Sequence, residues 1–156
     1  MQTTIAIDLA KNVFEVAISS YPGRIAKRQR LSRSRLPAIF AQQPPVTLLL
    51  EACGSSHHWA KQAQIHDHQV LHLPPHHVSR YRTGHKTDRA DAKALLEAHR
   101  NEEIRPVPVK SVEQQALTAS HRLRSRYLST RTARINTLRG VLREFCTRIE
   151  SLTIIE

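Results

Sequence analysis

With 156 residues, of which 40% are hydrophobic, the chain is long enough for one domain with a core of ordinary size. A formal charge of +11 and a pI near 10.6 are typical of proteins with a polyanionic partner and argue against an enzyme for small neutral molecules. No run approaches the ~18 apolar residues of a membrane span, no signal peptide is recognisable, and Cys53 and Cys146 lack CxxC spacing, so we expect a cytoplasmic protein without a membrane partner.

The first predicted element is an apolar strand within residues 4–12, and it carries one carboxylate, Asp8. Small or apolar residues on both faces indicate a central, covered strand. An ionised Asp in such a strand needs a partner, because removing an unpaired charge from water is very costly. Asp8 is therefore solvated where the turn over residues 10–12 begins, or salt-bridged, or bound to a metal ion.

Further strands and short helices follow the first strand. We predict strands over residues 13–18, 24–31, 46–51 and 70–73, and helices over residues 32–42 and 57–67. A meander of three strands, followed by helix, strand, helix, strand and helix, predicts an α/β fold with a mixed sheet and flanking helices. The very basic strand over residues 24–31 is expected at an edge of that sheet.

The strand over residues 46–51 is a continuous apolar run that ends in a second carboxylate, Glu51. Ligands collect at the carboxyl ends of strands in open α/β sheets, so Asp8 and Glu51 meet there if their strands are neighbours. Two adjacent carboxylates need a cation between them, or one of them must take up a proton. Ser55 or Ser56 is expected to cap the next helix, and Trp59 to anchor that helix in the core.

Residues 83–92 combine a loop with the start of a helix, and Asp88 and Asp91 share one face of its first turn. One interpretation is structural, with the two carboxylates at N-cap and N3, where they stabilise a helix start. The other joins them with Asp8 and Glu51 into a site of hard oxygen ligands for Mg²⁺ or Mn²⁺. Two such ions can clamp the attacking and leaving oxygens of a phosphodiester, which points to a nuclease or a strand-transfer enzyme.

From Ser111 onward the sequence predicts one long helix, begun by a partial capping box of Ser111 and Gln114. Apolar residues recur in steps of three and four, as in a coiled coil that joins two copies of the chain. They are residues 135, 138, 142, 145, 149 and 152. Arg131, Arg134 and Arg139 suit contacts with phosphate groups, and the basic residues 24–35 are the alternative surface.

The chain resembles the N-terminal part of the DEDD insertion-sequence transposases, the bridge-RNA-guided recombinases related to the pilin-gene invertase Piv. The matching pieces, in family order, are Ile7-Asp8-Leu9-Ala10-Lys11, Glu51-Ala52-Cys53-Gly54, Trp59, Leu73-Pro74-Pro75, residues 86–92 and Val107-Pro108-Val109-Lys110. The resemblance implies a ribonuclease-H-like, RuvC-like domain, a catalytic and metal-binding tetrad, and Mg²⁺, for which Mn²⁺ can substitute. The tetrad falls on Asp8, Glu51, Asp88 and Asp91.

The resemblance also implies DNA, a structured guide (bridge) RNA and a homodimer or tetramer as partners. Lys86 would then neutralise a phosphate beside the carboxylates. We expect the RuvC-like domain over residues 1–108 and the basic helix, for oligomerisation and nucleic-acid contact, over residues 109–156. The sequence departs from the family in two places. Ala6 stands where family members often have a Gly before the Ile-Asp pair. The family's C-terminal domain, which carries a nucleophilic Ser, is not reached, so we expect this chain to be incomplete for strand exchange.

Two rival functions are weighed against a transposase or recombinase. Actin-like ATPases share an Asp-bearing first hairpin but need glycine-rich phosphate turns, and this chain has only four glycines. A nucleic-acid-binding scaffold without catalysis, in which the carboxylates are caps and surface charges, stays open on the sequence alone.

Overall fold

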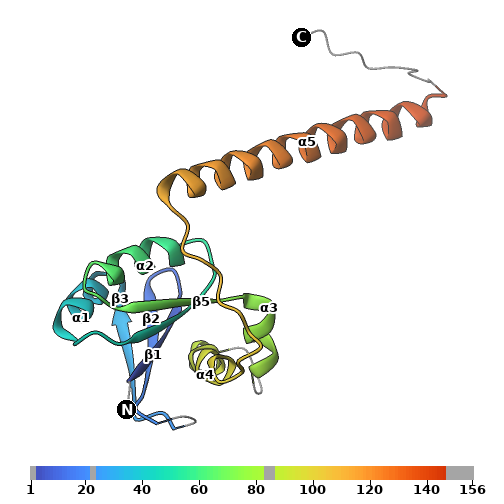
Figure 1. The fold of residues 1–156 in the computed structure, drawn as a ribbon. Helices are drawn as coiled ribbons and strands as arrows, with labels where there is room; N and C mark the ends of the chain where they lie inside the picture. The colour runs from blue at the N-terminus through green and yellow to red at the C-terminus, as the bar shows by residue number, and fades with distance from the viewer. Residues whose placement is uncertain (1–2, 22–23, 83–86, 147–156) are drawn as a thin grey trace. The chain divides into compact units, whose positions relative to one another are not determined.

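The computed structural model describes residues 3–21, 24–82 and 87–146 (Figure 1). Its contacts divide the chain into two compact units, residues 1–109 and 110–156, which are treated separately below. The elements of the first unit are β1 (Thr4–Leu9), β2 (Val13–Ser19), β3 (Lys27–Ser32), η1 (Arg33–Arg35), α1 (Leu36–Gln42), β4 (Thr47–Glu51), α2 (Ser56–Gln64), β5 (Gln69–Leu73), α3 (Pro75–Val78), η2 (Ser79–Tyr81) and α4 (Asp88–His99). The second unit contains α5 (Val112–Glu144).

The five strands form one mixed sheet in the order β3-β2-β1-β4-β5. β1, β2 and β3 are an antiparallel meander, whereas β4 runs parallel to β1 and β5 runs parallel to β4. A meander extended on one side by two parallel strands is the arrangement of a ribonuclease-H-like sheet. The mixed α/β fold with flanking helices is therefore confirmed.

Both faces of the sheet are covered, because each inner strand is apolar on both sides. On one face Ile5, Ile7 and Leu48 pack with α1 and α2, and Trp59 anchors α2 in this core, as predicted. On the other face Ala6 and Leu49 pack against α4 and α3. Figure 1 shows α1 and α2 on one side of the sheet and α4 on the other. Side chains at even positions of β1 thus face α4.

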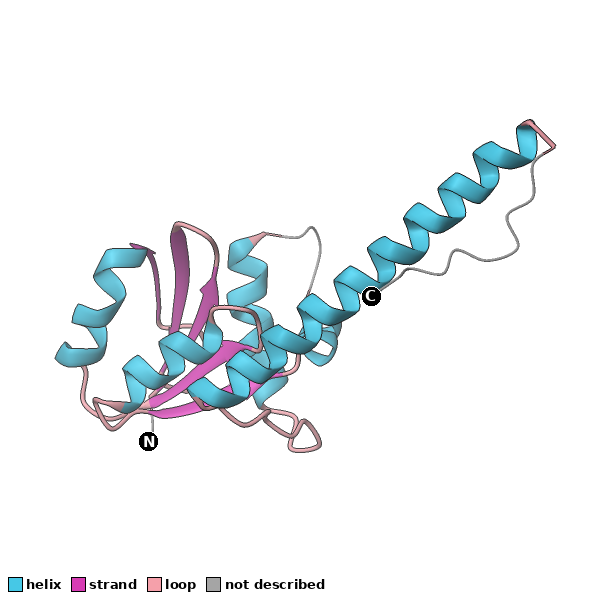
Figure 2. Cartoon of the chain, turned by 90° about the horizontal axis from the view of Figure 1, so that it is seen from above, coloured by secondary structure: helices cyan, strands magenta, loops and turns pink. Residues whose placement is uncertain are grey.

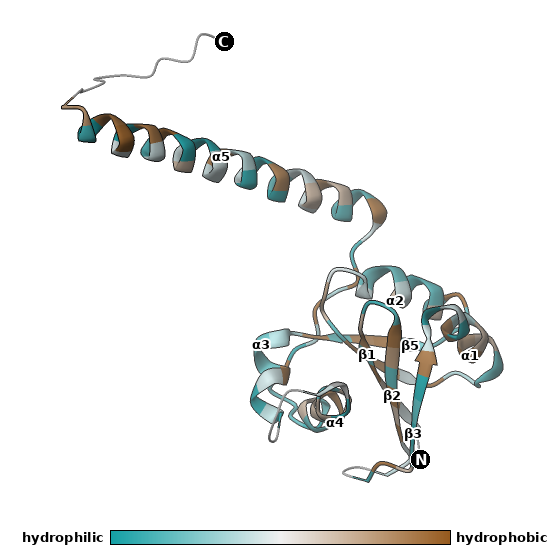
Figure 3. Ribbon diagram, turned by 180° about the vertical axis from the view of Figure 1, so that it is seen from behind, coloured by the Kyte–Doolittle hydropathy of each residue, from teal (hydrophilic) through white to brown (hydrophobic). Residues whose placement is uncertain are grey.

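The two edges of the sheet are protected in different ways. β3 is the edge next to β2, and its exposed Lys27, Arg28 and Arg30 discourage pairing with another strand. Figure 3 shows this strand largely in the hydrophilic colour. At the opposite edge, the N–H of Val107 donates to the carbonyl of His72 at 2.7 Å, so the segment before α5 covers β5. The expected position of the basic strand is confirmed.

Several predicted boundaries differ from those observed. The stretch 32–42 contains the short 3₁₀ turn η1 before α1, since Pro37 at the second position of α1 starts a new helix. Ser55 occupies the N-cap position of α2 without a side-chain hydrogen bond to the helix. Ser56 instead bonds Cys53, accepting from its N–H at 3.2 Å and donating to its carbonyl at 2.9 Å. Ser55 is therefore the N-cap residue, as expected, but neither serine side chain bonds a free N–H group of the helix.

The helix α5 is the one element described in the second unit, and Figure 2 draws it without interruption. Ser111 and Gln114 complete the predicted capping box, with the Gln114 N–H donating to Ser111 Oγ at 3.2 Å. The helix ends at Glu144, earlier than expected, because Phe145 and Cys146 form a tight turn and Cys146 adopts a left-handed φ of 53°. Across residues 3–21, 24–82 and 87–146, no helix combines the length and apolar character needed to cross a bilayer.

Candidate functional site

Asp8 and Glu51 lie side by side at the carboxyl ends of two neighbouring parallel strands. The register pairs Ile7 of β1 with Leu50 of β4, so Asp8 and Glu51 occupy the next position on each strand. Both are half-buried and alternate with Ala6 and Leu49, which places them on the sheet face that α4 covers. The prediction that these two carboxylates meet at one end of the sheet is confirmed.

A third carboxylate, Glu15, belongs to the same row and was missed by sequence reasoning. Glu15 is the cross-strand partner of Asp8 and is only 3% exposed. Its Oε2 lies 3.7 Å from Nε of Arg30, and its Oε1 lies 3.9 Å from Nε of Arg89. Strand alternation in residues 13–19 places Glu15 on the α4 face, but only the fold supplies the two arginines that make its burial tolerable.

The start of α4 is set by Thr87, which corrects the capping interpretation of the two aspartates. Thr87 is the N-cap, and its Oγ1 accepts from the N–H of Ala90 at 3.2 Å. Asp88 is consequently the first helical residue and Asp91 the fourth, where its own N–H already donates to the carbonyl of Thr87 at 3.0 Å. Helix capping does not account for the Asp91 carboxylate, because the N-cap is already supplied by Thr87.

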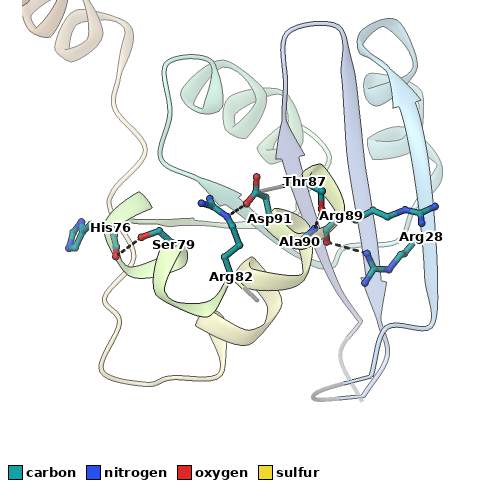
Figure 4. Close-up of polar contacts among 8 residues, drawn as sticks. All are labelled: Arg28, His76, Ser79, Arg82, Thr87, Arg89, Ala90 and Asp91. Atoms are coloured by element: carbon teal, nitrogen blue, oxygen red, sulfur yellow. Dashed lines mark hydrogen bonds and ion pairs between the residues drawn. The ribbon is translucent and has the colours of Figure 1, made fainter. Parts of the chain in front are cut away.

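Asp91 is 7% exposed and forms an ion pair with Arg82, whose Nε donates to Oδ1 (Figure 4). The two residues come from opposite sides of the loop that joins η2 to α4. A buried carboxylate needs a positive partner, and the Arg82 guanidinium provides it. Arg82 has no sequence motif that would have singled it out.

The predicted tetrad is brought together only in part. α4 packs on β1 and β2, so Asp91 and the row of Asp8 and Glu51 share one face of the sheet. Within the described part of the chain, no three His, Cys, Asp or Glu side chains are arranged to hold a metal ion. The side chain of Asp88 and all of Lys86 lie outside the described residues.

The arginines predicted to contact nucleic acid lie on α5. Arg131, Arg134 and Arg139 are all exposed, and no residue of α5 from Val112 to Glu144 is buried within this structure. Of the predicted apolar seam, Leu138 is 53% exposed and Phe145 is 72% exposed. The seam's last two positions, 149 and 152, lie outside the described residues. The coiled coil stays a prediction.

Sequence comparison places these observations in a family. The family model for DEDD transposases of the IS110 type, described as "Transposase", matches residues 5–147. A "Probable family 20 transposase" of Pseudomonas aeruginosa is 43% identical over 141 residues, which are 90% of this chain and 42% of that protein. The "Transposase for insertion sequence element IS1111A" of Coxiella burnetii is 33% identical over 141 residues, which are 90% of this chain and 39% of that protein.

Among solved structures, the RuvC structure of Thermus thermophilus aligns with 68% of this chain and 100% of its own length, with 12% identity and a TM-score of 0.49. This chain spans about two fifths of the length of the curated relatives it matches. A family match over nearly the whole chain, together with relatives above 30% identity, shows that the chain belongs to the DEDD transposases of the IS110 type.

Proposed function

We propose that Asp8, Glu51, Asp88 and Asp91 form the metal-binding and catalytic site of an enzyme that cleaves and exchanges DNA strands during transposition. One observation carries this proposal: Asp8 and Glu51 are adjacent in register on the sheet face against which α4 packs, and Asp91 is a buried residue of that helix. Carboxylate oxygens are the ligands that Mg²⁺ prefers, with Mn²⁺ as a substitute.

The donor set fits a divalent cation in its chemistry, and the ion pair at Asp91 supports this. A carboxylate with so little exposure needs positive charge, and Arg82 supplies it. Asp8, Glu51 and Asp91 would hold the ion once Arg82 moves from Asp91. A bound Mg²⁺ would stabilise negative charge on the phosphodiester oxygens during cleavage.

The elements around the site position these groups. The central strands β1 and β4 fix Asp8 and Glu51, while the cap at Thr87 fixes where α4 begins. In this proposal Lys86 neutralises a phosphate beside the carboxylates, and Arg131, Arg134 and Arg139 contact phosphates along α5.

Strand exchange requires a group that retains the broken strand as a covalent link. Carboxylates with a metal ion can activate an attacking oxygen, but they do not conserve the phosphodiester energy. We therefore propose that these 156 residues bind metal, DNA and a guide RNA and assemble as a dimer or tetramer through α5, whereas a Ser-bearing C-terminal domain completes the exchange. Incubation with guide RNA, paired DNA sites and Mg²⁺ should yield neither joined DNA nor a covalent protein–DNA adduct; either product would contradict this division.

The metal site is tested by Mn²⁺ titration calorimetry on Asp8→Asn, with Asp67→Asn as the matched control. Asp67 is exposed and has a φ of 60°, a conformation that Asn also accepts, so its variant makes the same chemical change away from the site. We expect Asp8→Asn to lose Mn²⁺ binding and the control to retain it. Equal binding by both variants would refute the site and favour a non-catalytic nucleic-acid-binding scaffold.

A further inference from the structure

Four charged residues lie in one row across the α4 face of the sheet. Register pairs Arg30 of β3 with Glu15 of β2 and Glu15 with Asp8 of β1, and Glu51 of β4 follows at the next position. Strands are spaced by about 4.8 Å, so Arg30 stands roughly 10 Å from Asp8 along this row. The row is therefore acidic over the centre of the sheet and becomes basic at its β3 edge.

Two more arginines join Arg30 at that edge. Arg28 is the next residue of β3 on the same face, and its guanidinium donates to the carbonyl of Arg89 at 3.1 Å (Figure 4). Arg89, from the first turn of α4, reaches back to Glu15. Two guanidinium groups, those of Arg30 and Arg89, thus lie within 4 Å of one buried carboxylate, and Arg28 joins them through its bond to Arg89, a residue 61 positions away in the chain.

Glu15 orients Arg30 and Arg89, and its single negative charge does not neutralise both. The side chains of Arg30 and Arg89 remain 66% and 75% exposed although both lie within 4 Å of Glu15. A guanidinium has five N–H donors in a planar fork, so a group held from one side by a carboxylate can still donate to a phosphate from the other. At the β3 edge, Arg28, Arg30 and Arg89 thus present positive charge to solvent, which suits a polyanion, while the carboxylates of the row lie further toward the centre of the sheet.

We propose that Arg28, Arg30 and Arg89 form a phosphate-binding surface, anchored by Glu15, that holds a phosphodiester backbone beside the carboxylates. The surface is made of residues of the first unit, none of them from α5, and it rests on the proposed function only in placing the bound strand next to the metal site. Contacts of this kind orient the backbone without reading its sequence.

The test measures binding of the full 156-residue chain to a DNA duplex and to a structured RNA of equal length, in EDTA, at 50 to 200 mM salt. The first variant, Arg28→Gln with Arg30→Gln, leaves Arg89 to partner Glu15. Its matched control, Arg80→Gln with Arg105→Gln, removes the same charge from two exposed arginines elsewhere in the unit. Because each phosphate contact adds about 0.9 to the slope of log affinity against log salt, we expect the first variant to flatten the slope by about 1.8, and the control to change it little.

A variant with unchanged net charge tests whether binding depends on the positions of these arginines or only on the net charge of the chain. Glu15→Gln with Arg89→Gln removes one negative and one positive charge, so net charge is unchanged, yet we expect weaker binding because the Arg89 contact is lost. The nucleic acid that responds, DNA or RNA, identifies the backbone that is held. Equal flattening by the first variant and its control, no flattening with either nucleic acid, or unaltered binding by the charge-neutral variant would overturn the proposal.

Because EDTA removes divalent cations, the nucleic-acid binding measured here does not depend on the proposed metal site. A failure of the proposed function would be seen as equal Mn²⁺ binding by Asp8→Asn and Asp67→Asn, whatever the salt dependence of the arginine variants. A failure of the phosphate surface would leave the Mn²⁺ titrations unaffected.

Discussion

Replacing Arg82 by Gln tests whether the Arg82–Asp91 pair stands in for a metal ion. The substitution leaves Asp91, which is 7% exposed, without its cation. Breaking a buried pair by removing one partner costs about 3–5 kcal/mol, and the partial exposure of Arg82 reduces the expected loss to about 2–3 kcal/mol. For a domain near 100 residues this lowers the melting temperature by about 10 °C in EDTA.

The same change should strengthen metal binding. If Mn²⁺ must displace Arg82 from Asp91, the wild-type chain breaks the ion pair on binding and the variant does not. At about 1.4 kcal/mol per factor of ten, the Mn²⁺ affinity of Arg82→Gln should rise at least tenfold and by up to about a hundredfold. Saturating Mn²⁺ should then raise the melting temperature of the variant more than that of the wild type.

Arg100→Gln is the matched control, because it removes an arginine from an ion pair at the other end of α4. Both pairs join an arginine guanidinium to a carboxylate. The Arg100 guanidinium lies 2.9 Å from Glu97 Oε2, and this pair is more exposed than the Arg82–Asp91 pair. Such surface pairs contribute about 0–1 kcal/mol, so the control should melt within a few degrees of wild type. Equal melting temperatures for Arg82→Gln and the control, or a weaker Mn²⁺ affinity in Arg82→Gln, would refute the reasoning.

Three further predictions concern α5 and the core. Changing Arg131, Arg134 and Arg139 to Gln should flatten the salt dependence of nucleic-acid binding by up to about 2.7 in slope, as measured by fluorescence anisotropy, and an unchanged slope would exclude this face of α5. Leu142→Asp should convert a dimer into monomers or insoluble protein, because it places a charge in the predicted seam; light scattering that finds wild type monomeric at tens of micromolar would exclude a dimer. Burial of His72, with His57 nearby, lowers the pKa of its imidazole, so stability should be full above pH 6.5 and fall as the pH drops below that value. His72→Gln should lessen this fall in urea midpoints between pH 7.5 and 5.5, and an equal fall in both proteins would show that His72 is not responsible.

The sheet and its carboxylates could be predicted because they depend on local pattern. Continuous apolar runs ending in Asp8 and Glu51 are recognisable without knowing what surrounds them, since a strand covered on both faces has to be apolar on both. Parallel strands also end at one edge of the sheet, so the meeting of these two residues follows from topology alone. The capping box at Ser111 and Gln114 is similarly local and was predicted correctly.

The partners of the charged groups depend on contacts between distant segments. Arg89 meets Glu15 because α4 packs on β2, and Arg82 meets Asp91 because η2 packs against α4; nothing in the spacing of these residues encodes that packing. Likewise Thr87, rather than Asp88, is the N-cap, so Asp91 is the fourth helical residue instead of the third. Local pattern identifies where a charge will be buried, whereas the tertiary structure decides which opposite charge makes that burial stable, because pairing energy is set by distance and burial in three dimensions.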